Sequence, residues 1–195
     1  MQRKFILSII IIAFLGVELK AQVATSLTYN MGFPVSDLQD YTNSTSFRGV
    51  SVDTRYFIED NATIGFYLGW QVFKERVDGL FEFDGNDISG LQVRYANTFP
   101  IMFTGHYHFG EDGGVRPYLG AGVGTVRSLQ RTDIGIFTIV NNNWHFAFYP
   151  EVGVFIPFTD DLGANVGIKY NYAIGSSDSI DYTYLGINVG LVWFK

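Results

Sequence analysis

Hydrophobic residues alternate with small or polar residues along much of the chain, and helical periodicity is almost absent. Between Thr63 and Phe73, large apolar side chains occupy every second position, while glycine, threonine, tyrosine or glutamine stands between them. The same alternation runs from Leu162 to Gly175 and from Tyr184 to Trp193. A strict period of two predicts β-strands with one apolar and one polar face.

The length of these runs separates a membrane barrel from a soluble β-sandwich. Each run has 10 or more residues, whereas an ordinary strand has about 5–6 residues and a membrane-spanning strand needs about 9–11. We therefore expect the strands to cross a bilayer. Because hydrocarbon offers no water to the backbone, only a closed barrel satisfies every strand, and the apolar face must contact lipid.

The chain contains eight such segments, namely 24–35, 47–58, 62–75, 91–109, 115–129, 144–158, 162–175 and 182–194. Three short connections, 59–61, 110–114 and 159–161, alternate with the longer and more polar segments 36–46, 76–90, 130–143 and 176–181. An even strand number with short periplasmic turns and long outer loops is typical of outer-membrane barrels. The sequence therefore predicts an all-β, eight-stranded, antiparallel up-and-down transmembrane barrel.

The N-terminal segment has the composition of a secretory signal peptide. Arg3 and Lys4 precede an apolar run of 13 residues, Phe5 to Val17. A helix of that length spans about 20 Å, which is short of a bilayer core of about 30 Å. We expect residues 1–21 to be removed after Ala21, leaving 22–195 as the barrel domain in the outer membrane.

Composition excludes several classes of protein. The 195 residues are 47% hydrophobic and 16% charged, and none is cysteine, which rules out disulfide scaffolds and thiolate metal sites. Without residues 1–21 the chain keeps 10 basic and 18 acidic residues, a net charge of −8. Nucleic acid is therefore not an expected partner, since phosphate binding needs a basic surface.

The inward face carries charged residues among small and polar ones. An eight-stranded lumen is only wide enough for side chains, so these charges are expected to pair. A hairpin centred on Asp160 sets Glu151 beside Lys169. The pairs could form a structural plug, or a narrow gated conduit if they exchange partners. The lumen ion-pair candidates are Asp53, Arg55, Arg94, Arg116, Glu151 and Lys169.

The histidines are the residues that could support catalysis. His106 and His108 share the inward face near the periplasmic rim, where a turn centred on Asp112 sets Tyr118 and Arg116 opposite them. Without a third ligand nearby, packing or hydrogen bonding suits this pair better than metal binding. His145 has Ser128 available on the neighbouring strand, an arrangement that could make a nucleophile and base.

No Gly-x-Ser-x-Gly elbow or phosphate-binding loop is present in the sequence. We therefore predict no catalytic residue, no cofactor and no metal site, and a protein that is not an enzyme.

Two segments resemble a known family. Pro100–Gly110 and the following Val115–Gly124, with its Pro-Tyr-x-Gly-x-Gly-x-Gly stretch, look like the central hairpin of small outer-membrane β-barrel proteins. These are the OmpA/OmpX-like barrels that are abundant in Bacteroidetes. The resemblance covers the whole mature chain and implies the barrel architecture, but it brings no catalytic residues.

The C-terminal segment resembles the signal that the barrel-assembly machinery reads, a polar residue, glycine and a terminal aromatic residue. Gly190, Trp193 and Phe194 carry this resemblance. Lys195 stands where the family has its last aromatic residue, so recognition would depend on Trp193 or Phe194.

These observations predict a monomeric integral outer-membrane barrel with a structural or surface-interaction role, in which the outer loops bind an extracellular ligand. Its expected partners are outer-membrane lipid and lipopolysaccharide and the barrel-assembly machinery. Two alternatives are a lipid-modifying enzyme, such as a lipid A deacylase, and a narrow channel.

Overall fold

The computed structural model describes residues 22–83, 86–111, 113–175 and 180–195. The predicted signal peptide, 1–21, lies outside the described residues. Among those residues, no helix is long and apolar enough to cross a membrane. The elements are β1 (Val23–Val35), α2 (Asp37–Tyr41), β2 (Ser46–Glu59), β3 (Ala62–Phe83), β4 (Asn86–His108), β5 (Arg116–Ile134), β6 (Phe137–Pro157), β7 (Leu162–Ala173) and β8 (Tyr182–Phe194).

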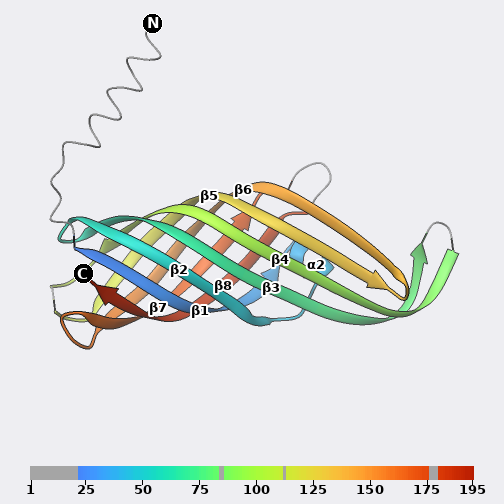
Figure 1. The fold of residues 1–195 in the computed structure, drawn as a ribbon, viewed down its shortest axis with the longest axis horizontal. Coiled ribbons are helices and arrows are strands. Elements are labelled where there is room, and N and C mark those ends of the chain that lie inside the picture. Colours follow the sequence, from blue (N-terminus) through green and yellow to red (C-terminus); the bar gives the residue numbers. More distant parts are fainter. Residues whose placement is uncertain (1–21, 84–85, 112, 176–179) are drawn as a thin grey trace, which may run out of the picture.

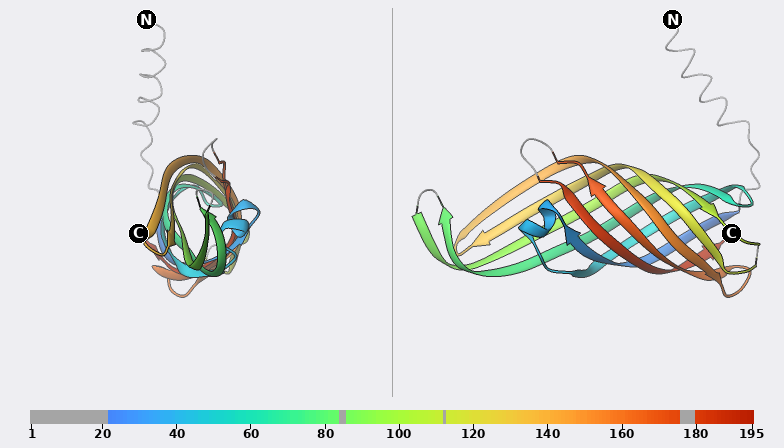
Figure 2. Two further views of the ribbon diagram at one scale, coloured as in Figure 1. Left: turned by 90° about the vertical axis from the view of Figure 1, so that its right-hand side faces the viewer. Right: turned by 180° about the vertical axis from the view of Figure 1, so that it is seen from behind.

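The eight strands pair antiparallel in chain order and close into a barrel, as predicted. Closure is made by β1 and β8, which pair from Ala24 opposite Phe194 to Val35 opposite Thr183. Figure 2 shows the closed ring from its end and the tilt of the strands from the side. The short turns lie at the end where the chain terminates, which is the periplasmic end by the rule for outer-membrane barrels (Figure 1).

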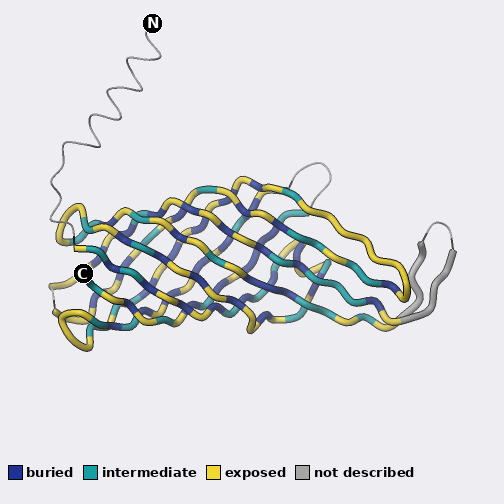
Figure 3. The backbone as a smooth tube through the Cα atoms, viewed as in Figure 1, coloured by how far each residue is buried: buried dark blue, intermediate teal, exposed yellow. Residues whose placement is uncertain are grey.

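Burial alternates along the bilayer-spanning part of the strands, as the sequence predicts (Figure 3). On β3 the side chain of Leu68 is 47% exposed, while its neighbour Tyr67 is 4% exposed. The outward residues form an apolar belt in which Trp70 stacks on Phe99 and Phe66 meets Phe103 edge to face. Such a belt is stable only against lipid, because water would meet a continuous apolar surface around the barrel.

Two of the predicted outer loops, 76–90 and 130–143, are wrong: strands occupy most of both. β3 and β4 extend to Phe83 and from Asn86, and β5 and β6 are joined by the two residues Gly135 and Ile136. Gly135 has a φ of 57°, the left-handed value that the first position of a type II′ hairpin turn requires. On β6, residues 137–142 are all exposed, so both faces of the strand meet water and the apolar alternation that marks the spanning segments is lost there.

The predicted loop 36–46 contains the short helix α2. Its Leu38 is fully buried and belongs to an apolar core inside the outer half of the barrel, together with Phe73 and Tyr184. These two rings meet edge to face with centroids 5.2 Å apart. The helix therefore covers the outer mouth of the lumen.

The lipid-facing assignment can be tested with Leu68→Arg. Leu68 lies between Val52 and Ile101 in the middle of the apolar belt. An arginine there should destabilise the folded barrel in the bilayer by about 2–4 kcal/mol. Urea unfolding in lipid vesicles measures this loss. The control is Ile136→Arg, which puts the same charge at the 93% exposed tip of the hairpin above the belt and should change little. Equal stability of the two variants would overturn the assignment.

Candidate functional site

A cluster of charged and aromatic side chains fills the lumen on the periplasmic side of its centre. Glu151 is the hub of this cluster, and its side chain is only 1% exposed. Its carboxylate accepts hydrogen bonds from the Tyr118 hydroxyl at 2.9 Å and the His106 Nε2 at 3.2 Å. Lys169 Nζ lies 3.7 Å and Arg55 Nη2 3.9 Å from the carboxylate oxygens.

The cluster extends from Glu151 in two directions. Arg55 also binds Asp53, with its Nη2 2.8 Å from Oδ2, and its guanidinium lies 4.8 Å from the centre of the Tyr118 ring. Lys169 Nζ lies 3.9 Å above the ring of Tyr67. Two carboxylates thus balance two cations, and aromatic faces complete the surroundings of both cations.

The strand register positions this cluster. Glu151 and Lys169 are directly opposite one another on β6 and β7, as the turn centred on Asp160 implies. The β5 glycines make the room: a Cβ on Gly120 would lie 2.2 Å from the His106 ring. On Gly122 a Cβ would lie 2.5 Å from the ring of Tyr149. The alternating glycines of β5 therefore make room for large inward rings on its two neighbouring strands, β4 and β6.

Four of the six lumen candidates, Asp53, Arg55, Glu151 and Lys169, meet in the cluster, and the structure does not bring Arg94 and Arg116 into it. Arg94 lies toward the outer end, where it donates to the carbonyl oxygens of Tyr41 at 3.1 Å and Asp40 at 3.4 Å. Arg116 lies at the other end and donates to the Asp60 carbonyl oxygen at 2.6 Å and to Asn61 Oδ1 at 2.8 Å. Alternation specifies which face a residue occupies but not its height in the barrel, and height separates these two arginines from the cluster.

Arg94 and Tyr41 hold α2 against the outer mouth. The Tyr41 hydroxyl donates to the carbonyl oxygen of Arg131 at 3.0 Å and lies 2.8 Å from Thr132 Oγ1. Burial raises the pKa of Tyr41 above its ordinary value, so its hydroxyl remains a donor in alkaline as well as neutral solution.

The predicted pairing of the two inward histidines is shifted by two residues. His108 lies opposite Tyr118, and His106 lies opposite Gly120. The shift arises because the turn is centred on Gly113 rather than on Asp112. His108 stacks on Phe57 with ring centroids 5.7 Å apart. In the described ranges, no group of three histidine or acidic side chains could hold a metal ion.

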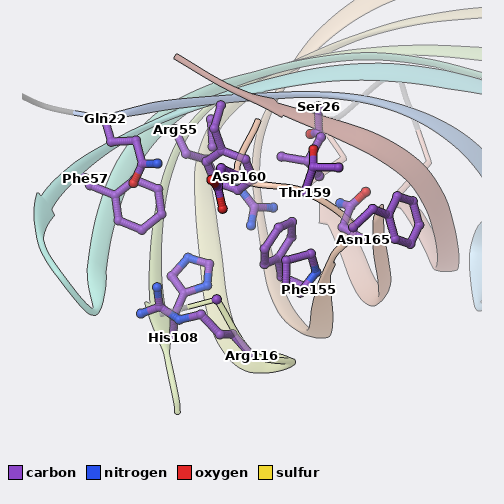
Figure 4. A pocket seen from close by; sticks show the side chains of 16 residues that line it. Gln22, Ser26, Arg55, Phe57, His108, Arg116, Phe155, Thr159, Asp160 and Asn165 are labelled. Atoms are coloured by element: carbon purple, nitrogen blue, oxygen red, sulfur yellow. The ribbon is translucent and has the colours of Figure 1, made fainter. Parts of the chain in front are cut away.

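A cavity of about 360 Å³ opens between this cluster and the periplasmic turns (Figure 4). Its polar lining includes Arg55, His108, Arg116 and Asn165, and its apolar lining is dominated by phenylalanines. Two other cavities of the described lumen, farther toward the outer end, have volumes of about 10 Å³ each. A space of that size holds at most one water molecule.

The phenylalanines of the cavity were missed in the sequence, although the alternation contains the signal. Phe57 has the same parity as Asp53 and Arg55, and Phe155 has the same parity as Glu151. At the C-terminal end, Trp193 is 44% exposed on the outer surface, and Phe194 lines the cavity. Of the two aromatic residues in the predicted assembly signal, only Trp193 therefore faces lipid.

Ser128 and His145 lie next to one another inside the outer half of the barrel. Ser128 Oγ is 2.8 Å from His145 Nε2, and His145 Nδ1 donates to the carbonyl oxygen of Ile174 at 2.9 Å. This arrangement leaves Nε2 free to accept the serine proton. Ser128 is 1% exposed and His145 2% exposed, so neither faces solvent or lipid.

A family model described as the OmpW family matches residues 41–184. The chain belongs to the OmpW family. This match runs from the end of α2 into β8 and so includes most of the barrel. No curated protein matches the chain.

Solved structures of outer-membrane barrels share the fold of this OmpW-family chain. Neisserial surface protein A is 19% identical with a TM-score of 0.54, and the match covers 89% of this chain and 96% of that protein. Ail of Yersinia pestis, solved with the heparin analogue sucrose octasulfate, is 13% identical with a TM-score of 0.57, covering 91% and 100%. The β-barrel domain of Pseudomonas aeruginosa OprF is 14% identical with a TM-score of 0.52, covering 89% and 97%. The OmpW-family chain is thus an integral outer-membrane barrel.

Removing one partner of an ion pair should cost much more folding stability in the buried Glu151 cluster than on the exposed hairpin. Glu151→Ala removes the carboxylate that Lys169 contacts and leaves Arg55 with Asp53 alone. The buried charge that is left without its partner should destabilise the barrel by about 3–5 kcal/mol. Urea unfolding in vesicles measures this loss. The control, Arg131→Ala, breaks the exposed hairpin pair in which Arg131 Nε lies 2.9 Å from Asp133 and should change stability little. Equal losses in the two variants would contradict the role of Glu151.

Proposed function

We propose that this OmpW-family barrel has a surface-interaction role and binds a polypeptide ligand through the hairpin formed by β5 and β6. The main observation in support of this proposal is the exposed apolar end of that hairpin. Ile136 at its tip is 93% exposed, and Ile139 and Val140 are 41% and 54% exposed. The stretch 137–144 contains no charged residue, which is unusual for a strand that meets water on both faces.

The backbone of this stretch supports the same kind of ligand. Among the described residues, β6 pairs with β7 only from Ala147 to Pro157, while its other edge pairs with β5 up to Phe137 opposite Ile134. Residues 137–145 therefore present a strand edge above the bilayer. An open edge with neighbouring apolar side chains favours an added strand from another polypeptide. Ail was solved with a polyanion, but the uncharged stretch here favours a neutral, extended peptide segment.

The filled lumen supports this proposal over a narrow channel. The Glu151 cluster and the apolar core that contains Leu38 of α2 occupy the space between the periplasmic cavity and the outer mouth, where the two cavities described above are about 10 Å³ each. Conduction would require both the ion pairs and the aromatic core to rearrange together.

The hairpin proposal can be tested with a shortened variant in which Asn-Gly replaces residues 130–141. Leu129 and Asn142 are directly opposite one another, so a two-residue turn can join them. Cells carrying the variant should adhere at least tenfold less to surfaces coated with extracellular proteins than cells carrying the full barrel. Heat-modifiable migration on a denaturing gel checks that the variant has assembled.

The matched control for this experiment is Thr138→Ser, which keeps the edge and its apolar side chains and should adhere like the unaltered protein. Undiminished adhesion of an assembled, shortened barrel would refute the hairpin proposal.

The Ser128–His145 pair has the residue types of a nucleophile and its base, which is the basis of the alternative function, a lipid-modifying hydrolase. Its burial argues against this function, because a nucleophile must reach the ester bond that it attacks. We expect Ser128→Ala to leave the lipid A profile of cells unchanged, as measured by mass spectrometry. Loss of an acyl-chain cleavage product in the variant, with barrel abundance unchanged, would establish the enzyme instead.

A further inference from the structure

We propose that the periplasmic cavity is a binding site for an uncharged carbohydrate of one or two pyranose rings. The cavity lies within the closed ring of strands and opens at the end that carries the short turns (Figures 1 and 4). It is separate from the outer hairpin on which the proposed surface interaction depends. Its volume of about 360 Å³ falls within the range of about 300–1,000 Å³ for small-molecule sites.

One wall of the cavity is aromatic. Phe57, Phe155 and Phe194 come from the periplasmic ends of β2, β6 and β8, and all three line the space. The ring centroid of Phe194 lies 5.0 Å from that of Phe155 and 6.4 Å from that of Phe57. These rings present apolar surface to an opening that water can enter, which is unfavourable until a ligand covers it. The C–H face of a pyranose ring is a suitable cover.

Two buried polar atoms of the cavity lining need hydrogen-bond partners. His108 is 5% exposed and Asn165 4% exposed, and both line the cavity. Neither His108 Nε2 nor Asn165 Oδ1 has a hydrogen-bond partner in the part of the chain that the structure describes. A buried polar atom without a partner carries a desolvation penalty of about 1–3 kcal/mol. Figure 4 shows the His108 and Asn165 side chains among those that line the cavity.

The chemistry of these two atoms favours hydroxyl groups. An amide oxygen only accepts hydrogen bonds, whereas an imidazole nitrogen accepts or donates according to its tautomer. A hydroxyl group both donates and accepts, so neighbouring hydroxyls on one ring can serve both atoms. A carboxylate or phosphate group without a proton cannot donate to Asn165 Oδ1.

The charges around the cavity favour a neutral ligand. The guanidinium of Arg55 is already bound to Asp53 at 2.8 Å and lies near Glu151. At the rim, Arg116 and Asp160 contribute one charge of each sign. Arg116 likewise already donates to the Asp60 carbonyl oxygen and to Asn61 Oδ1, so both guanidinium groups have acceptors within the protein and are not waiting for an anion. An uncharged, multiply hydroxylated ring with one apolar face satisfies all four conditions of size, aromatic wall, polar atoms and charge.

Ligand-observed NMR on the barrel in lipid nanodiscs, with the imidazole resonances of the histidine-labelled protein recorded in parallel, tests this inference. The probes are D-glucose, N-acetyl-D-glucosamine and their β-1,4-linked disaccharides, with D-glucuronate and D-glucosamine as charged analogues. We expect saturable binding of at least one neutral probe, a chemical-shift change of the His108 imidazole, and at least tenfold weaker binding of both charged analogues.

The variants identify the site. Asn165→Leu removes the acceptor and should weaken binding at least tenfold, whereas Asn171→Leu makes the same change at an inward asparagine that does not line this cavity and should bind normally. If Asn165→Leu fails to assemble, His108→Phe provides the second test with the same expected loss. No saturable binding of any neutral probe, tighter binding of a charged analogue, or unchanged binding in the cavity variant would overturn the inference. Adhesion through the hairpin is measured separately and does not depend on these outcomes.

Discussion

The constraint on which this structure depends is that a strand inside a bilayer must find all its backbone hydrogen bonds within the protein. Eight strands meet it by closing, with β1 and β8 joined up to the last residues, where Val23 N donates to the Lys195 carbonyl oxygen at 2.9 Å. Closure with eight strands leaves a lumen that side chains can fill. Every inward residue must then be small, packed or paired. Gly120 meets this requirement by being small, and the residues around Glu151 meet it by pairing.

The lumen is divided along its length into three zones with different chemistry. The outer zone holds the apolar core that contains Leu38 of α2, together with the buried Ser128–His145 pair. The middle zone is the charge cluster around Glu151, and the periplasmic zone is the open cavity with its phenylalanines. Because the middle is filled, interactions with other molecules are expected at the ends and on the hairpins. The two proposals place a polypeptide at one end and a carbohydrate at the other.

The sequence predicts the membrane-spanning part well because lipid on one side and a polar lumen on the other impose the period of two. The Glu151–Lys169 pairing follows from the same pattern and a short turn centred on Asp160. Prediction fails where this constraint ends. Strands in 130–143 were missed because water surrounds both faces there, and the histidine register shifted because the β4–β5 turn is centred on a glycine one residue later. Heights in the barrel, which separate Arg94 from the cluster, depend on the tilt of all strands and cannot be read from one segment.

The central claim is that lipid surrounds one face of each spanning strand and that the other face fills the lumen. Spin labels placed singly at the non-glycine positions from Thr63 to Gln71 of β3, with oxygen and a water-soluble nickel complex as relaxation agents, measure this most directly. The account predicts high oxygen accessibility at Ile64, Phe66, Leu68 and Trp70 and low accessibility to both agents at the inward positions Thr63, Tyr67 and Gln71. Uniform accessibility along the strand, or oxygen accessibility at the opposite set of positions, would contradict it.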